Sequence, residues 1–67
     1  MSVLKVIEIM SDSTKSWEDA TVKGVAKAHK TLKRIKSAYV QSQSVTIVKD
    51  GKVSTYRVTL KISFEIL

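Results

Sequence analysis

The chain has 67 residues, 43% of them hydrophobic, so its length allows one domain spanning residues 1–67. The absence of cysteine and the single histidine exclude disulfide bonds and zinc sites built from these residues as sources of stability. A chain of about 60 residues buries only about 60% of the surface that its unfolded form exposes. Oligomerisation or a very well-packed core must therefore add stability. The net charge of +6 is concentrated in residues 17–36, where six basic residues stand against two acidic ones.

Targeting and membrane segments are not recognisable in the sequence. The longest apolar run is three residues, whereas a membrane-spanning helix needs about 20. The first residues lack the basic start and apolar stretch of a secretory signal. We therefore expect a cytoplasmic protein that does not contact membranes.

Residues 3–10 are rich in branched apolar side chains and predict a first β-strand, which the polar residues 11–14 end. Because side chains alternate along a strand, apolar residues fall on both faces. One face carries Val3, Ile7 and Ile9, and the other carries Leu4, Val6 and Met10. A single subunit cannot easily cover both faces, so this strand favours contact with other subunits.

A helix is predicted from Ser16 to about Lys36. The Ser16 hydroxyl can cap its free N–H groups, and acidic residues follow in the first turn. At 100° per residue, one face is mainly apolar and comprises Thr21, Val22, Val25, Ala28, His29, Leu32 and Ile35. The opposite face comprises Lys23, Lys27, Lys30 and Arg34. His29 lies on the apolar face, which we expect to point inward. This position favours a packed or interface residue over a catalytic one.

Residues 38–48 and 52–66 predict a long β-hairpin. The Asp50-Gly51 pair between them is typical of a two-residue turn with positive φ. If Val48 lies opposite Val53, then Val45, Gln43, Gln41 and Tyr39 lie opposite Tyr56, Val58, Leu60 and Ile62, unless a bulge shifts the register. Residues 55–66 alternate strictly between polar and apolar. Since the usual strand has about 5–6 residues, part of this hairpin should extend past the helix.

The element order predicts an α+β fold of β-α-β-β type, with one helix on a three-stranded antiparallel sheet. The apolar surface of the long hairpin and the two apolar faces of the first strand predict a homo-oligomer.

Residues suited to catalysis are scarce. One histidine, six scattered carboxylates and no cysteine provide no nucleophile–base pair, so we expect no enzymatic activity and no catalytic residues. Gly24 lies in the predicted helix and Gly51 in the turn, which leaves no glycine-rich phosphate loop. The basic helix face could bind nucleic acid. No aromatic residues interleave with its lysines, so an ordinary solvated surface is favoured.

Four stretches together resemble the dodecin family over essentially the whole chain. They are Lys5-Val6-Ile7-Glu8-Ile9, Ser16-Trp17-Glu18-Asp19-Ala20, Asp50-Gly51-Lys52-Val53 and Tyr56-Arg57-Val58-Thr59-Leu60-Lys61-Ile62-Ser63-Phe64. The resemblance implies a non-enzymatic protein whose helix is wrapped by a three-stranded sheet and which assembles into a hollow homododecamer. Flavin-binding dodecins hold stacked pairs of flavins, so the resemblance also implies storage or quenching of a flavin such as FMN.

Both family positions that contact flavin are altered in this chain. In flavin-binding dodecins the ring stacks on a tryptophan that begins the second strand and hydrogen-bonds to a glutamine in the third. The resemblance places Ser37 and Arg57 at these positions, which predicts weakened flavin binding. Trp17 aligns with the helix start and is interpreted as a packing anchor. Arg57 could still stack on a ring or hold a phosphate, so weak or differently posed flavin binding remains an alternative.

A dodecin branch with the same departures resembles this chain further, through Ser-Trp-Glu at the helix start and Tyr-Arg in the last strand. That branch is flavin-independent and associated with calcium. Calcium needs six to eight oxygen ligands, and the scattered carboxylates here identify no metal ligands. Three hypotheses follow: a storage protein for a small ligand such as flavin; a flavin-free variant that binds calcium or acts as a scaffold; and an assembly that binds anions or nucleic acid through its basic helix faces.

Overall fold

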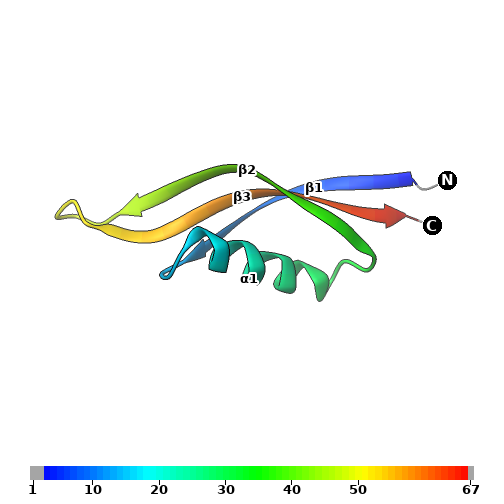
Figure 1. Cartoon of the computed structure of the whole chain (residues 1–67), viewed down its shortest axis with the longest axis horizontal. Helices are drawn as coiled ribbons and strands as arrows, with labels where there is room; N and C mark the ends of the chain where they lie inside the picture. Colours follow the sequence, from blue (N-terminus) through cyan, green and yellow to red (C-terminus); the bar gives the residue numbers. More distant parts are fainter. Residues whose placement is uncertain (1–2, 67) are drawn as a thin grey trace.

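The computed structural model describes residues 3–66, which form one helix and one antiparallel sheet. The elements are β1 (Val3–Ser13), α1 (Trp17–His29), β2 (Ile35–Ile47) and β3 (Val53–Ile66). The strand order is β1-β3-β2, so β3 is central, and α1 lies against one face of the sheet (Figure 1). This arrangement confirms the predicted α+β fold. The described part contains no helix with the length and apolar character that a membrane crossing requires.

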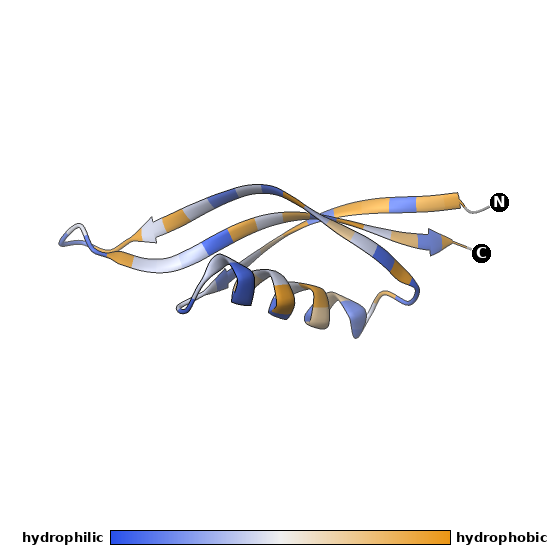
Figure 2. Ribbon diagram, viewed as in Figure 1, coloured by the Kyte–Doolittle hydropathy of each residue, from blue (hydrophilic) through white to orange (hydrophobic). Residues whose placement is uncertain are grey.

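The core lies where α1 crosses the central strand. Its fully buried apolar residues are Ala20 of α1 and Val58, Leu60 and Ile62 of β3. The three from β3 share one face because they are spaced two residues apart, and Figure 2 shows the alternation along this strand. Six partly buried residues pack around them: Ile7, Ile9, Trp17, Val25, Ala28 and Ile35.

The sheet is much longer than the helix. The molecule measures 51 × 19 × 15 Å. The β2–β3 turn projects beyond one end of α1, and the outer ends of β1 and β3 project beyond the other (Figure 1). This confirms that the long hairpin extends past the helix and leaves apolar side chains at both ends without cover from α1.

The start of α1 is confirmed, but its predicted end at residue 36 is wrong. The Ser16 hydroxyl accepts a hydrogen bond from the Asp19 N–H at 2.9 Å, as expected of a cap. The helix ends at His29. Arg34 then adopts a left-handed φ of 63°, and its carbonyl accepts a hydrogen bond from the Glu65 N–H. Ile35 pairs with Phe64, which satisfies backbone hydrogen-bonding groups at the end of β3. A longer helix would leave these groups unpaired.

The predicted inward face of the helix is only partly correct. Val25 and Ala28 pack on the core, whereas Val22 is 68% exposed and His29 is exposed. The closest approach to the sheet is instead at Gly24, where an added Cβ would lie 2.9 Å from the Ser11 Cβ. Small residues let α1 approach the sheet closely, a role that hydrophobic periodicity does not detect.

The first strand continues three residues past its predicted end at residue 10. Its polar side chains find partners instead of breaking the strand. The Ser11 hydroxyl donates to the Ala20 carbonyl at 2.7 Å, and the Ser13 hydroxyl donates to the Asp19 carboxylate at 2.6 Å. These bonds join the end of β1 to the first turn of α1.

The hairpin turn differs from the predicted two-residue turn. The Val48 N–H donates to the Lys52 carbonyl, the Gly51 N–H donates to the Val48 carbonyl, and Gly51 has a φ of 85°. The loop therefore has three residues, with glycine in the left-handed position. The added residue places Ile47, not Val48, opposite Val53.

The register of β2 against β3 is confirmed at its centre and wrong toward its ends. Val45 lies opposite Tyr56 and Gln43 opposite Val58, as predicted. Tyr39 lies opposite Lys61 rather than Ile62 because β2 has a register shift between Val40 and Ser42. β2 also begins at Ile35, earlier than the predicted residue 38, with another shift between Ile35 and Ser37.

Candidate functional site

Ser37 and Arg57 lie on the face of the sheet that points away from α1. The side chains of Val58 and Ile62 face the helix, so those of Arg57 and Ser63 face the opposite way. Ser37 pairs with Ser63, six positions along β3 from Arg57. At about 3.3 Å per residue, the two candidate residues are about 20 Å apart. One subunit therefore does not bring them into a single pocket.

Ser37 has the hydroxyl of Ser63 as its direct neighbour. Its hydroxyl hydrogen-bonds to that of Ser63, and Val6 lies on the other side of Ser63 in β1. Two residues along β2, Tyr39 is 66% exposed and lies opposite Lys61 on the same face. Tyr39 was not among the functional candidates from the sequence, although its two-residue spacing from Ser37 places both on one face.

Arg57 is engaged by Asp12, its direct neighbour across the β1–β3 ladder. The Nε atom donates to Oδ1 at 2.7 Å, and Nη2 donates to Oδ2 at 2.9 Å. This hydrogen bonding lowers the pKa of Asp12 and raises that of Arg57. The Nε–Nη2 edge of the guanidinium group, one of the two edges that could hold a phosphate, is therefore already occupied.

Trp17 links the start of α1 to the hairpin, as expected of an anchor. Its indole Nε1–H donates to the Ser44 carbonyl at 2.9 Å. Its ring meets that of Tyr56 edge to face, with a centroid distance of 5.2 Å and an interplanar angle of 76°. The hydrogen bond and the ring contact both give Trp17 a structural role.

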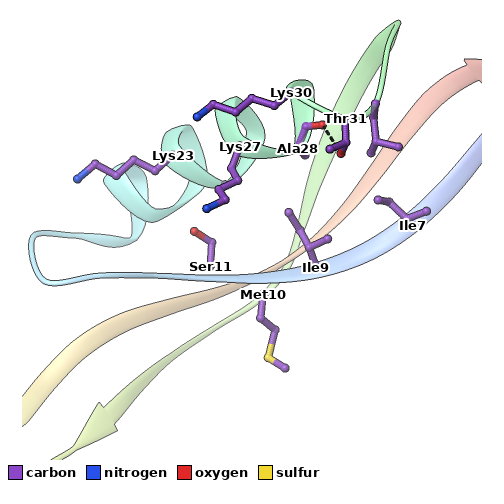
Figure 3. A pocket seen from close by; sticks show the side chains of 11 residues that line it. Ile7, Ile9, Met10, Ser11, Lys23, Lys27, Ala28, Lys30 and Thr31 are labelled. Carbon is purple, nitrogen blue, oxygen red and sulfur yellow. Dashed lines mark hydrogen bonds between the residues drawn. The ribbon is translucent and has the colours of Figure 1, made fainter.

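A groove of about 650 Å³ lies between α1 and β1 (Figure 3). Its apolar lining includes Ile7, Ile9, Ala28 and Leu32, and its lysines are Lys23, Lys27 and Lys30. Lys23 also forms an ion pair with Asp19 at 3.1 Å. The sequence favoured these lysines as part of a solvated face. Their position beside an apolar groove follows from the way α1 packs on β1.

The carboxylates within residues 3–66 of one subunit do not form a metal site. In the part of the chain from residue 3 to 66, no three acidic or histidine side chains gather as metal ligands would. Asp12 is held by Arg57, and Glu65 lies 3.9 Å from both Arg34 and Lys36. The Asp19 carboxylate accepts hydrogen bonds from Ser13 and Lys23. Both lower the pKa of Asp19, and Ser13 has the larger effect.

Fold and sequence together define a family. The family model for dodecins matches residues 3–66, so this chain belongs to the dodecin family. The resemblance seen in the sequence is thereby confirmed.

Among characterised relatives, calcium dodecin of Mycobacterium tuberculosis is 40% identical over 65 residues, which cover 97% of this chain and 90% of that protein. The crystal structure of that calcium dodecin, described as having a novel calcium-binding site, superposes with a TM-score of 0.86 at 38% identity and covers 98% of this chain and 93% of the other. A point mutant of T. thermophilus dodecin superposes with a TM-score of 0.89 at 30% identity, covering 100% and 98% of the two chains.

Proposed function

We propose that the protein is a non-catalytic, self-associating small-ligand-binding protein of the calcium dodecin type. The observation that carries this choice is the Arg57–Asp12 pair, which occupies the group that a flavin would meet at this position. Ser37 supplies no aromatic ring at the other flavin position. The 40% identity to a calcium dodecin supports the same choice.

Self-association, with a homododecamer as the expected state, is supported by apolar surface that one subunit leaves uncovered. Four apolar residues of β1 that α1 does not cover are exposed: Val3, Leu4, Val6 and Met10. The groove beside α1 adds further apolar surface. Contiguous exposed apolar surface marks interaction sites. Native mass measurement tests this proposal, and a monomer at micromolar concentration would contradict it.

A calcium site in this protein would combine oxygen ligands from several subunits or from backbone carbonyls, since one subunit brings no acidic cluster together in residues 3–66. The test is thermal unfolding of the assembled protein with CaCl₂, with MgCl₂ and with excess chelator. We expect Ca²⁺ to raise the Tm and the chelator to reverse the rise. An unchanged Tm at millimolar Ca²⁺ would contradict the proposal.

Flavin binding is the second candidate, and the exposed Tyr39 near Ser37 favours it, because its ring could stack on a flavin. Quenching of flavin fluorescence on titration tests it directly. The double substitution Ser37→Trp with Arg57→Gln should create or strengthen quenching. If this variant assembles normally but shows no gain, the assignment of Ser37 and Arg57 to the flavin positions is wrong. The third hypothesis, anion or nucleic-acid binding by the lysines, predicts strongly salt-dependent retention.

A further inference from the structure

The pair formed by Asp12 and Arg57 is unusual among the ion pairs of the described residues. It has two short hydrogen bonds, whereas the Lys23–Asp19 pair has one contact of 3.1 Å and the contacts of Glu65 with Arg34 and Lys36 are 3.9 Å long. Both partners are in adjacent strands and directly opposite each other. Their positions are therefore set by the β1–β3 ladder, which shows no register shift, and not by flexible loops.

The pair is partly open to solvent and has hydroxyl-bearing residues beside it. The side chains of Arg57 and Asp12 are 40% and 39% exposed. Ser44 lies opposite Arg57 on the β2 side, and Thr59 follows on the same face of β3. A ligand could therefore reach the Nε–Nη2 edge of the guanidinium group if the carboxylate did not occupy it.

We propose that Asp12 is a positioning residue that determines the charge of ligand this face accepts, because it occupies the Nε–Nη2 edge of Arg57, neutralises its charge and so disfavours phosphate groups. The proposal deepens the proposed function and rests on it where natural ligands are concerned. With Asp12 in place the pair has no net charge. Without it, Arg57 presents a free cationic group beside two hydroxyl-bearing residues.

The physical basis is competition between two similar anions. Carboxylate and phosphate both match the planar, two-pronged donor geometry of arginine. Asp12 is held beside Arg57 by the fold, so it has an advantage over any phosphate in solution. A phosphate that approached the pair would also be repelled by the Asp12 charge.

The test is Asp12→Asn in the assembled protein, with inorganic phosphate as the probe. The chain has only two arginines, Arg34 and Arg57, so their Nε–H signals can be followed separately by NMR. We expect phosphate to shift the Arg57 signal in Asp12→Asn with an affinity at least about tenfold higher than in the unmodified protein. The Arg34 signal should not respond comparably.

Three further variants exclude a merely structural effect. Glu65→Gln removes the carboxylate near Arg34 and should leave the phosphate response of Arg57 unchanged. Asp12→Glu, which retains a carboxylate, should restore exclusion. Asp12→Asn with Arg57→Gln, which has no Arg57 signal and is followed by its backbone amide signals at residues 12 and 57, should show no comparable phosphate shift. Equal phosphate responses of the unmodified protein and folded Asp12→Asn would overturn the proposal.

Two further measurements test the role of Asp12 even if Asp12→Asn does not assemble or the proposed function is wrong. If Asp12→Asn does not assemble, the unmodified protein decides: a saturable phosphate response of Arg57 at low millimolar phosphate would overturn the proposal. The affinity ratio of FMN to riboflavin, which differ by the phosphate, should rise in Asp12→Asn. A protein that binds neither calcium nor flavin would contradict the proposed function, while the inorganic phosphate result would still test the role of Asp12.

Discussion

Strands β2 and β3 are neighbours of nearly equal length, 13 and 14 residues, yet their environments differ. β3 pairs on both sides and contributes three of the four buried apolar residues found among residues 3–66, whereas β2 has no buried residue. The β2–β3 ladder has three register shifts, and the β1–β3 ladder has none. Position in the sheet, more than apolar content, decides which strand forms the core. The apolar side chains of β2 remain available to another subunit.

The sharpest test of this difference is a matched pair of substitutions in opposed residues. Leu60 of β3 is fully buried, and its β2 partner Val40 is 38% exposed. Leu60→Ala should lower the free energy of unfolding by about 2–5 kcal/mol, because it removes packed atoms and leaves a cavity. Val40→Ala should cost much less within the subunit. Denaturant unfolding at a fixed protein concentration measures both effects.

The result for Val40→Ala also bears on assembly. If Val40→Ala destabilises as strongly as Leu60→Ala and weakens the native oligomer, Val40 is buried between subunits. Equal destabilisation without any change in oligomeric state would contradict the contrast between the two strands.

A smaller effect is expected where α1 approaches β1. Gly24→Ala places a Cβ 2.9 Å from the Ser11 Cβ and 3.1 Å from the Leu60 Cδ1. We expect overpacking to lower the free energy of unfolding by about 1–3 kcal/mol. The higher helix propensity of alanine acts in the opposite direction and is worth about 1 kcal/mol over glycine. The measurement is thermal unfolding. The exposed Ala26→Gly provides the control, since it reports helix propensity without the contact. A stabilised Gly24→Ala variant would show that this close approach is wrong.

The connection between α1 and the hairpin should contribute less again. Trp17→Phe removes the hydrogen bond to the Ser44 carbonyl but retains an aromatic ring beside Tyr56. The expected loss is about 1 kcal/mol, the usual net value of one hydrogen bond. Trp17→Ala, which also loses the ring contact, should cost more. Hydrogen exchange of the hairpin amides checks whether the loss is local, and equal losses in the two variants would contradict a separate role for the ring.

The smallest effect concerns acid stability. Hydrogen bonding lowers the pKa of Asp12 and Asp19 in the folded state. Their stabilising contribution is therefore complete above the ordinary carboxyl value of about 3.8 and is lost as the pH falls through the lowered folded value. Asp12→Asn should flatten the decline in Tm below about pH 4, with little change of slope near neutral pH. An unchanged acid slope would contradict this role of the pair.

Local patterns predicted the parts of the fold that depend on neighbouring residues. The Ser16 cap, the alternation of β3 and the existence of the hairpin all follow from short sequence signals, and all are confirmed. The end of α1 was missed because Leu32 and Ile35 continue the helical period, while pairing of Ile35 with Phe64 satisfies the backbone of β3. Competition between a helix and a distant strand is not visible in a local pattern.

The candidate site was predictable only as two positions. Ser37 and Arg57 came from the resemblance to dodecins, and their assignment to a ligand site stays a prediction. The partner of Arg57 was not predictable, because Asp12 lies 45 residues away along the chain and becomes its neighbour only through the β1–β3 ladder. The groove beside α1 was missed for the same reason.

By itself, the sequence determined the class of fold, the family and the shortage of internal core, since these depend on composition, period and short motifs. The tertiary structure decided which residues share a face, where α1 ends and which charged groups are already paired. The physical reason is that strand register and helix placement bring together residues that no local pattern connects. The occupied guanidinium group of Arg57 is the clearest example.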